Sequence, residues 1–107
     1  MANDYKNAKV DLTANTATVL YTAPAARTAV FKSILVSEDS GNADTITVTI
    51  TDAAAAVFSI FKVKAVGANG TVELLTQPLI VEAGEIIKLT AATANRLHVV
   101  ASFMEIS

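Results

Sequence analysis

Asp44-Thr45-Ile46-Thr47-Val48-Thr49-Ile50-Thr51-Asp52 is the stretch that decides the fold class of this chain. Three aliphatic residues alternate in it with four threonines. Successive side chains of a β-strand point to opposite faces of the sheet, so a period of two predicts one aliphatic and one threonine face. The threonine face is either exposed to solvent or a hydroxyl-lined contact surface, and we expect the solvent-exposed case.

Similar short segments follow along the whole chain. Turn residues separate them at intervals of about 8–12 residues, which is typical of sandwiches and barrels. We expect Ala53 to Ala56 to form a turn, because four residues cannot nucleate a helix and the preceding Asp52 favours turns. The further expected strands are Ala8 to Thr13, Thr16 to Tyr21, Thr28 to Ser37, Ala55 to Lys64, Thr71 to Leu75, Leu79 to Val81, Gly84 to Ala91 and Leu97 to Ile106.

These segments predict an all-β, antiparallel two-sheet β-sandwich of eight or nine short strands. Connections this short cannot carry parallel crossovers, so the pairing must be antiparallel. Jelly-roll-like and immunoglobulin-like arrangements both remain open. A chain of 107 residues forms one domain, 1–107. Residues 1–7 have no apolar pattern and are a candidate flexible N-terminal arm.

Several expected strands have two apolar faces. In Leu97 to Ile106, Val100, Met104 and Ile106 lie opposite the predicted core side. The same alternation places Val30, Ile34 and Val36 opposite Phe31 and Leu35, Val57, Phe61 and Val63 opposite Phe58 and Ile60, and Val19 on the side of Tyr21. Such strands are either central and covered by loops or the N-terminal arm, or they pack on a neighbouring subunit. The candidate interface residues are Val100, Met104, Ile106, Phe58 and Ile60.

The composition indicates a folded chain and disfavours several classes of partner. It is 52% hydrophobic and 17% charged, with a net charge of −2. We expect no nucleic-acid partner because no basic field attracts phosphate. We expect no membrane partner and no Sec-type export, because no apolar run is long enough to span a bilayer and the start has no apolar region. The chain has no cysteine, which rules out disulfides.

No residue pattern points to catalysis, to a cofactor or to a metal site, and we expect no enzyme. The single histidine, His98, lies within a strand pattern, and no Gly-x-Ser-x-Gly motif accompanies it. Glu38, Asp39 and Asp44 flank a Ser-Gly-Asn turn that could offer oxygens to calcium, but a polar hairpin turn is the expected structure. The remaining candidate features are Glu82 and Glu85 about a turn, the glycine-rich segment 67–70 without a following helix, and Lys62 and Lys64 as edge or rim charges.

The order of several turn-and-strand segments resembles small β-sandwich virion proteins of tailed bacteriophages, including phages of cyanobacteria. The segments that carry the resemblance are Leu20-Tyr21-Thr22-Ala23-Pro24-Ala25, Thr28-Ala29-Val30-Phe31-Lys32-Ser33-Ile34, Ser40-Gly41-Asn42-Ala43-Asp44-Thr45-Ile46-Thr47-Val48, Leu79-Ile80-Val81-Glu82-Ala83-Gly84-Glu85 and Ala94-Asn95-Arg96-Leu97-His98-Val99-Val100-Ala101-Ser102. It spans nearly the whole chain and contains no catalytic signature.

This resemblance implies a passive structural role in the virion. The expected function is capsid decoration (cement), with the major capsid protein or other virion proteins as partners and a homo-oligomer as the expected assembly. The protein would then be made in the host cytoplasm and located in the virion. A neck, tail or fibre-associated role is the alternative. A receptor- or carbohydrate-binding module is weaker, because the chain has no tryptophan and its phenylalanines fit core positions.

Overall fold

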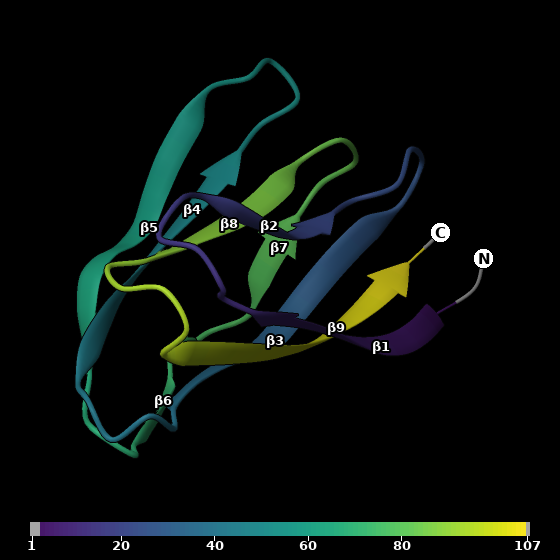
Figure 1. Cartoon of the computed structure of the whole chain (residues 1–107). Helices are drawn as coiled ribbons and strands as arrows, with labels where there is room; N and C mark the ends of the chain where they lie inside the picture. Colours follow the sequence, from purple (N-terminus) through teal and green to yellow (C-terminus); the bar gives the residue numbers. More distant parts are fainter. Residues whose placement is uncertain (1–2, 107) are drawn as a thin grey trace.

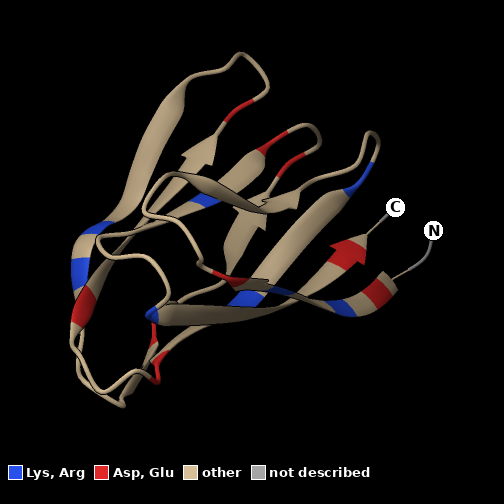
Figure 2. Cartoon of the chain, in the orientation of Figure 1, with Lys and Arg blue, Asp and Glu red and all other residues tan. Residues whose placement is uncertain are grey.

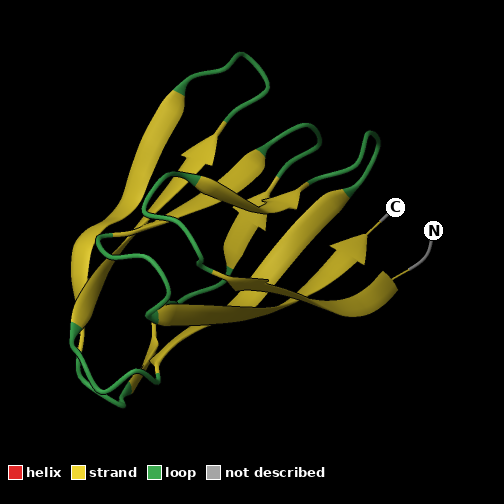
Figure 3. Ribbon diagram, viewed as in Figure 1, coloured by secondary structure: helices red, strands yellow, loops and turns green. Residues whose placement is uncertain are grey.

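The computed structural model describes residues 3–106, and every helix or strand found in that range is a β-strand (Figure 3). The strands are β1 (Asn3–Asp11), β2 (Thr18–Thr22), β3 (Thr28–Glu38), β4 (Asp44–Thr51), β5 (Val57–Val66), β6 (Thr71–Glu73), β7 (Leu79–Val81), β8 (Ile86–Ala91) and β9 (Leu97–Ile106). The all-β prediction is therefore confirmed. The turn predicted at Ala53 to Ala56 is also present, closed by a hydrogen bond from the Ala55 N–H to the Asp52 carbonyl.

The strands form two antiparallel sheets packed as a β-sandwich (Figure 1). In the five-stranded sheet the order is β1-β9-β3-β6, and β7 pairs with β3 beyond the end of β6. In the four-stranded sheet the order is β2-β8-β4-β5. β9 and β3 are thus the central strands of the first sheet, and β5 is an edge strand of the second.

The pairing is nested, as in one long hairpin folded over on itself. β1 pairs with β9, β2 with β8, β3 with β6 and β7, and β4 with β5. The loops 23–27, 52–56 and 82–85 consequently lie at the same end of the sandwich, at the top of Figure 1. The outer pairs, above all β1 with β9, place residues from distant parts of the chain side by side.

The core lies between the sheets and is made by alternate residues of both. Ile46, Val48, Ile87 and Leu89 of the four-stranded sheet are fully buried, which confirms the aliphatic face predicted for β4. They face Ala29, Phe31, Ile34, Val36, Leu97, Val99, Ala101 and Phe103 of the five-stranded sheet. Tyr21, Phe31 and Phe103 form an aromatic cluster with ring centroids 4.6–5.2 Å apart.

A β-bulge in β3 makes the predicted faces of that strand wrong. The register shifts between Phe31 and Ser33, which leaves Lys32 as an extra residue. Phe31 is therefore buried on the same side as Ile34 and Val36, while Val30 lies on the outer face with Leu35. An extra residue reverses the alternation, so a strict period of two fails beyond it.

Bulges in β2 and β5 likewise make their side-chain faces differ from those predicted by strict alternation. The register of β2 shifts between Val19 and Tyr21, so Tyr21 is buried and Val19 is exposed. In β5, Phe61 pairs with Val48 and Phe58 with Ile50, two inward-facing residues of β4. Phe61 and its neighbour Ile60 both pack against the core, where the unbroken alternation had placed them on opposite faces, and Phe58 is exposed.

The N-terminal strand is longer than the edge strand expected at Ala8 to Thr13. Residues 3–7, which the sequence favoured as an arm, form the first half of β1 and pair with 102–106 of β9. Residues 1 and 2 of that arm lie outside the described residues. Within residues 3–106 no helix has the length and apolar character that crossing a membrane would require.

Candidate protein-interaction surface

The titratable side chains of residues 3–106 form surface contacts, turn hydrogen bonds and one ionic network. Among residues 3–106, no group of three or more His, Cys, Asp and Glu side chains is placed to hold a metal ion. His98 lies on the outer face of β9, with Nε2 3.2 Å from an Asp11 oxygen and Nδ1 3.4 Å from an Asp39 oxygen. The structure places no hydroxyl nucleophile in contact with this imidazole among the hydrogen bonds of the described residues. The group is a pair of surface contacts rather than a triad.

The acidic turn after β3 is organised by Glu38. Its buried carboxylate accepts hydrogen bonds from the backbone N–H groups of Ser40, Gly41, Asn42 and Asn69, at 2.8–3.1 Å, and from the Ser40 hydroxyl. Burial raises the pKa of Glu38, but these donors outweigh it and lower the pKa to about 2. The oxygens that could have bound calcium therefore hold two loops together.

The other two turns that the sequence singled out are local structures. The Glu85 carboxylate accepts a hydrogen bond from the Glu82 N–H across the turn at Gly84, whose φ is +81°. The glycine-rich segment closes as a turn through a hydrogen bond from the Gly70 N–H to the Gly67 carbonyl. Asn69 in that turn donates its N–H to Glu38. Both turns connect strands, and neither leads into a helix.

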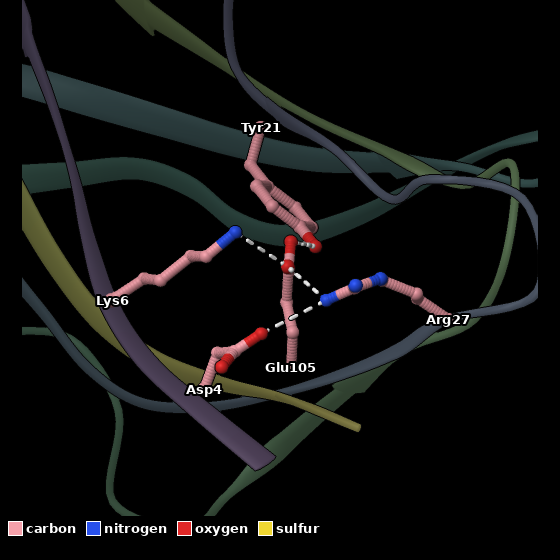
Figure 4. Close-up of polar contacts among 5 residues, drawn as sticks. All are labelled: Asp4, Lys6, Tyr21, Arg27 and Glu105. Carbon is pink, nitrogen blue, oxygen red and sulfur yellow. Dashed lines mark hydrogen bonds and ion pairs between the residues drawn. The ribbon is translucent and has the colours of Figure 1, made fainter. Parts of the chain in front are cut away.

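An ionic network around the buried Glu105 carboxylate connects β1 and β9 to the β2–β3 loop (Figure 4). Glu105 accepts hydrogen bonds from the Lys6 ammonium at 2.8 Å, the Tyr21 hydroxyl at 2.6 Å and the Arg27 guanidinium at 3.3 Å. Arg27 also contacts Asp4 at 3.1 Å. The hydrogen bond from Lys6 and that from Tyr21 lower the pKa of Glu105, whereas burial and this carboxylate raise the pKa of Tyr21.

The outer face of the five-stranded sheet carries a continuous apolar row. The Cα register places Tyr5 beside Met104, Met104 beside Val30, and Val30 beside Ile80. Directly paired residues of antiparallel strands point to the same face, so the four side chains form one row across β1, β9, β3 and β7. Tyr5 is 81% exposed and Ile80 50% exposed. Solvent thus reaches an unbroken line of large apolar groups.

Further apolar residues lie along the strands, beyond a polar row formed by Asn7, Ser102 and Ser33. Val100 and Leu35 are paired and both exposed, and Ile106 lies at the end of β9. We use "the apolar outer face" for Tyr5, Val30, Leu35, Ile80, Val100, Met104 and Ile106. Of the five residues predicted to form an interface, Val100, Met104 and Ile106 therefore share this face.

A charged residue stands at each side of the Val100–Leu35 pair. Lys9 of β1 is paired with Val100, and Glu73 of β6 is paired with Leu35. The Glu73 carboxylate accepts hydrogen bonds from the Ser33 hydroxyl and from the Ile34 and Leu75 N–H groups, which bridge the gap between β6 and β7. Burial raises the pKa of Glu73, but the Ser33 hydroxyl and backbone donors lower it overall, so the carboxylate is ionised at neutral pH.

The outer face of the four-stranded sheet has a different character. Thr45, Thr47 and Thr49 of β4 point outward beside Lys88 and Thr90 of β8. Val19 is the exposed aliphatic residue on β2 and lies next to Lys88. Figure 2 shows that the charges are scattered, with the acidic residues mostly near strand ends and most lysines within strands. The two outer faces therefore differ in side-chain chemistry rather than in charge.

The other two predicted interface residues lie apart from the apolar outer face. Phe58 and Ile60 are on β5, the edge strand of the four-stranded sheet, which diverges from the sandwich on the left of Figure 1. Phe58 is exposed, while Ile60 is partly buried against the core. Lys62 and Lys64 lie on the same edge strand. The five predicted interface residues thus lie on two separate surfaces.

A shallow hollow of about 360 Å³ indents the apolar outer face beside the row. Tyr5, Asn7, Ser102, Met104 and Lys32 contribute to its lining, together with Lys6 and Phe103. The hollow lies beside the β3 bulge, where Lys32 is the extra residue. It is at the lower end of the size of small-molecule sites and has no converging acid–base pair.

Sequence reasoning missed four residues of this face: Tyr5, Val30, Leu35 and Ile80. Tyr5 fell within the expected arm, and the bulge at Lys32 moved Val30 to the outside. Leu35 and Ile80 were read as parts of strands without an assigned outer face. The signal available was the placement of apolar residues at both even and odd positions of β3 and β9.

Comparison with known proteins yields little beyond these observations. No family model and no curated protein matches this chain. Two crystal structures of a pentameric capsid protein isolated from metagenomic phage sequences, one of them solved by iodide phasing, are similar to it at 18% sequence identity and a TM-score of 0.45. The match covers 94% of this chain but only 58% and 60% of those chains. Similarity at this level carries no functional information.

Proposed function

We propose that this protein is a virion structural protein of a tailed bacteriophage, which acts through protein–protein contacts and not through catalysis. The observation that carries the proposal is the apolar outer face of the five-stranded sheet. The resemblance of the whole sequence to small virion proteins indicates the kind of particle in which this face would be used.

An apolar row of this kind is costly to leave in water. Burying apolar surface stabilises a contact by about 25 cal/mol per Å², and soluble monomers rarely expose large contiguous apolar patches. Tyr and Met, both present in the row, are enriched in protein interfaces. The face therefore fits a surface that another protein covers.

Within the virion we propose a capsid decoration role, with the major capsid protein as the principal partner. A small domain is suited to capping a lattice, where many modest contacts add up to firm attachment. Of the two architectures left open by the sequence, the nested pairing of the strands favours a jelly roll over an immunoglobulin-like sandwich. A neck, tail or fibre position is the second candidate.

A cryo-EM map of the particle encoded by the same genome tests this proposal. Density for the chain at regular positions on the head surface is the expected result. Density in the neck, tail or fibre would replace decoration with the second candidate. Absence of the chain from purified particles, by both the map and mass spectrometry, would overturn the virion role.

Two further measurements address the other classes of function. A glycan array with the purified protein should give no specific hit, because Tyr5 and Phe58 are the exposed aromatic side chains among residues 3–106 and they lie on different sheets. A specific hit lost on mutating Tyr5 would favour a carbohydrate-binding module. Turnover of any substrate that depends on His98 would contradict the structural role.

A further inference from the structure

We infer that the apolar outer face of the five-stranded sheet binds a second copy of this chain, face to face, about a twofold axis parallel to the strands and between β9 and β3. This inference rests on the proposed function and deepens it by naming the occupant of the surface. The second copy covers the apolar outer face, so the dimer would attach to the particle through its remaining surfaces. It rests on how the residues of that face are ordered across the sheet.

The order of one row is complementary to itself. Across the sheet the residues run Lys9, Val100, Leu35, Glu73, from β1 through β9 and β3 to β6. A twofold axis along the strands exchanges the two ends of this row in the facing copy. Lys9 then lies opposite Glu73 of the second copy, and Val100 lies opposite Leu35. Symmetry creates this ion pair twice, once at each side of an apolar centre.

The apolar row fits the same operation. Tyr5 and Met104 on one copy face Ile80 and Val30 of the other, so apolar groups meet apolar groups along the whole row. The half-exposed Ile80 is brought over the hollow that Tyr5 and Met104 help to line. Lys32, also at the hollow, has a long flexible stem that allows its ammonium to stay hydrated at the rim.

The alternative twofold axis, perpendicular to the strands, is much less favourable. It reverses the order of rows along the strands, so Glu73 faces Ile80 and Lys9 faces Tyr5. Both charges would then lose water without gaining a partner, which costs several kcal/mol per ion. Charge complementarity therefore selects the axis parallel to the strands.

The face approaches the size that a stable dimer needs. Four strands at about 4.8 Å spacing and nine residues at about 3.3 Å give a flat area of roughly 19 by 30 Å. A stable interface needs about 800 Å² of accessible surface from each partner. That is about one seventh of the 5671 Å² surface of this chain. The flat area is about 570 Å², and the relief of the side chains adds accessible area to it. The four-stranded sheet offers threonines and Lys88 instead, which water solvates well.

The chain provides a matched pair of variants to test this. Ile80 and Val19 are 50% and 49% exposed and lie on the outer faces of opposite sheets. Sedimentation equilibrium should give twice the 11.1 kDa mass of one chain for the wild type and for Val19→Asp. Ile80→Asp should raise the dimer dissociation constant by about 100-fold or more, because it buries an unpaired charge against Tyr5 of the other copy. Unchanged far-UV circular dichroism establishes that each variant is folded.

Zero-length carbodiimide cross-linking tests the orientation. Within one copy Lys9 and Glu73 are three strand spacings apart, about 14 Å, so they cannot be joined directly. A mixture of ¹⁴N- and ¹⁵N-labelled protein should yield a Lys9–Glu73 cross-link of mixed isotopic composition. Lys9→Glu should abolish the cross-link and weaken the dimer, whereas Lys88→Glu on the other sheet should do neither.

Two results would overturn the inference: a monomer at all accessible concentrations, or a dimer that is insensitive to Ile80→Asp and lacks the Lys9–Glu73 cross-link. These results are distinguishable from failure of the proposed function. A monomeric protein found in the particle would keep the virion role and remove the dimer. A dimer that shows the expected cross-link but is absent from particles would keep the dimer and remove the virion role.

Discussion

Glu105 is the residue on which both chain ends depend. Its carboxylate is nearly buried, with 4% exposure, and holds Lys6 of β1 and Arg27 of the β2–β3 loop. Glu105→Gln should lower the free energy of unfolding by about 1.5–3 kcal/mol at pH 7, the range for hydrogen bonds to charged groups. Urea unfolding measures this change. Glu82→Gln, in an exposed turn, is the control and should unfold like the wild type.

The same residue makes stability depend on pH. Because the pKa of Glu105 is lowered from 4.5 in the folded state, the unfolded chain takes up the proton first as the pH falls. Its contribution is complete above pH 4.5 and is lost as the pH falls through the folded value. Glu38, with a pKa of about 2, acts in the same direction. Urea midpoints of the wild type should fall between pH 5 and 2 more steeply than those of Glu105→Gln; equal slopes would contradict this.

Replacing the Thr51 hydroxyl by a methyl group should stabilise the folded protein. Its hydroxyl is buried and has no hydrogen-bond partner in the structure. An unsatisfied buried polar group costs about 1–3 kcal/mol, and valine has nearly the same shape. Thr51→Val should therefore raise the free energy of unfolding by about 1 kcal/mol. Thr47→Val on the same strand is the control, because the Thr47 hydroxyl accepts a hydrogen bond from the Val63 N–H and its loss should be destabilising. A gain from both variants would show that β-propensity alone is responsible.

At the scale of the element, bulges determine what each strand presents. β5 is an edge strand whose register shifts twice against β4, and Val63 within it has a φ of +52°. Bulges on an edge strand hinder edge-to-edge aggregation. Association through this edge is therefore disfavoured. The surface that remains for protein contacts is the apolar outer face of the other sheet, which binds through side chains.

The conformation of Val63 predicts an unusual response to glycine. A β-branched residue at positive φ is strained, by about 1–2 kcal/mol, and glycine removes this strain. Val63→Gly should raise the thermal midpoint, even though glycine normally weakens a strand. Val57→Gly is the matched control, at 62% exposure against 60% and without a positive φ, and should lower the midpoint. A lower midpoint for both variants would refute the strain at Val63.

For the whole molecule, the sequence predicted the class of fold but not the composition of its surface. Alternation at Ile46, Val48 and Ile50 was enough to predict β4, because the local sequence of this strand determines which side chains face the core. The faces of β2, β3 and β5 depend on bulges, and a bulge is fixed by the partner strand rather than by local sequence. Tyr5 and Ile80 meet in one row only because the nested pairing joins residues 75 positions apart. No local pattern could have predicted that row.

That row predicts how the stability of the whole molecule depends on its concentration. A dimer that binds through the apolar outer face stabilises the folded state by mass action, so the thermal midpoint should rise with protein concentration. A tenfold increase corresponds to about 1.4 kcal/mol per dimer, and hence to a rise of about 3–5 °C for a domain of this size. Differential scanning calorimetry of the wild type and Val19→Asp should show this rise, whereas Ile80→Asp should give a midpoint independent of concentration. A rise of equal size in all three proteins would place the contact elsewhere on the molecule.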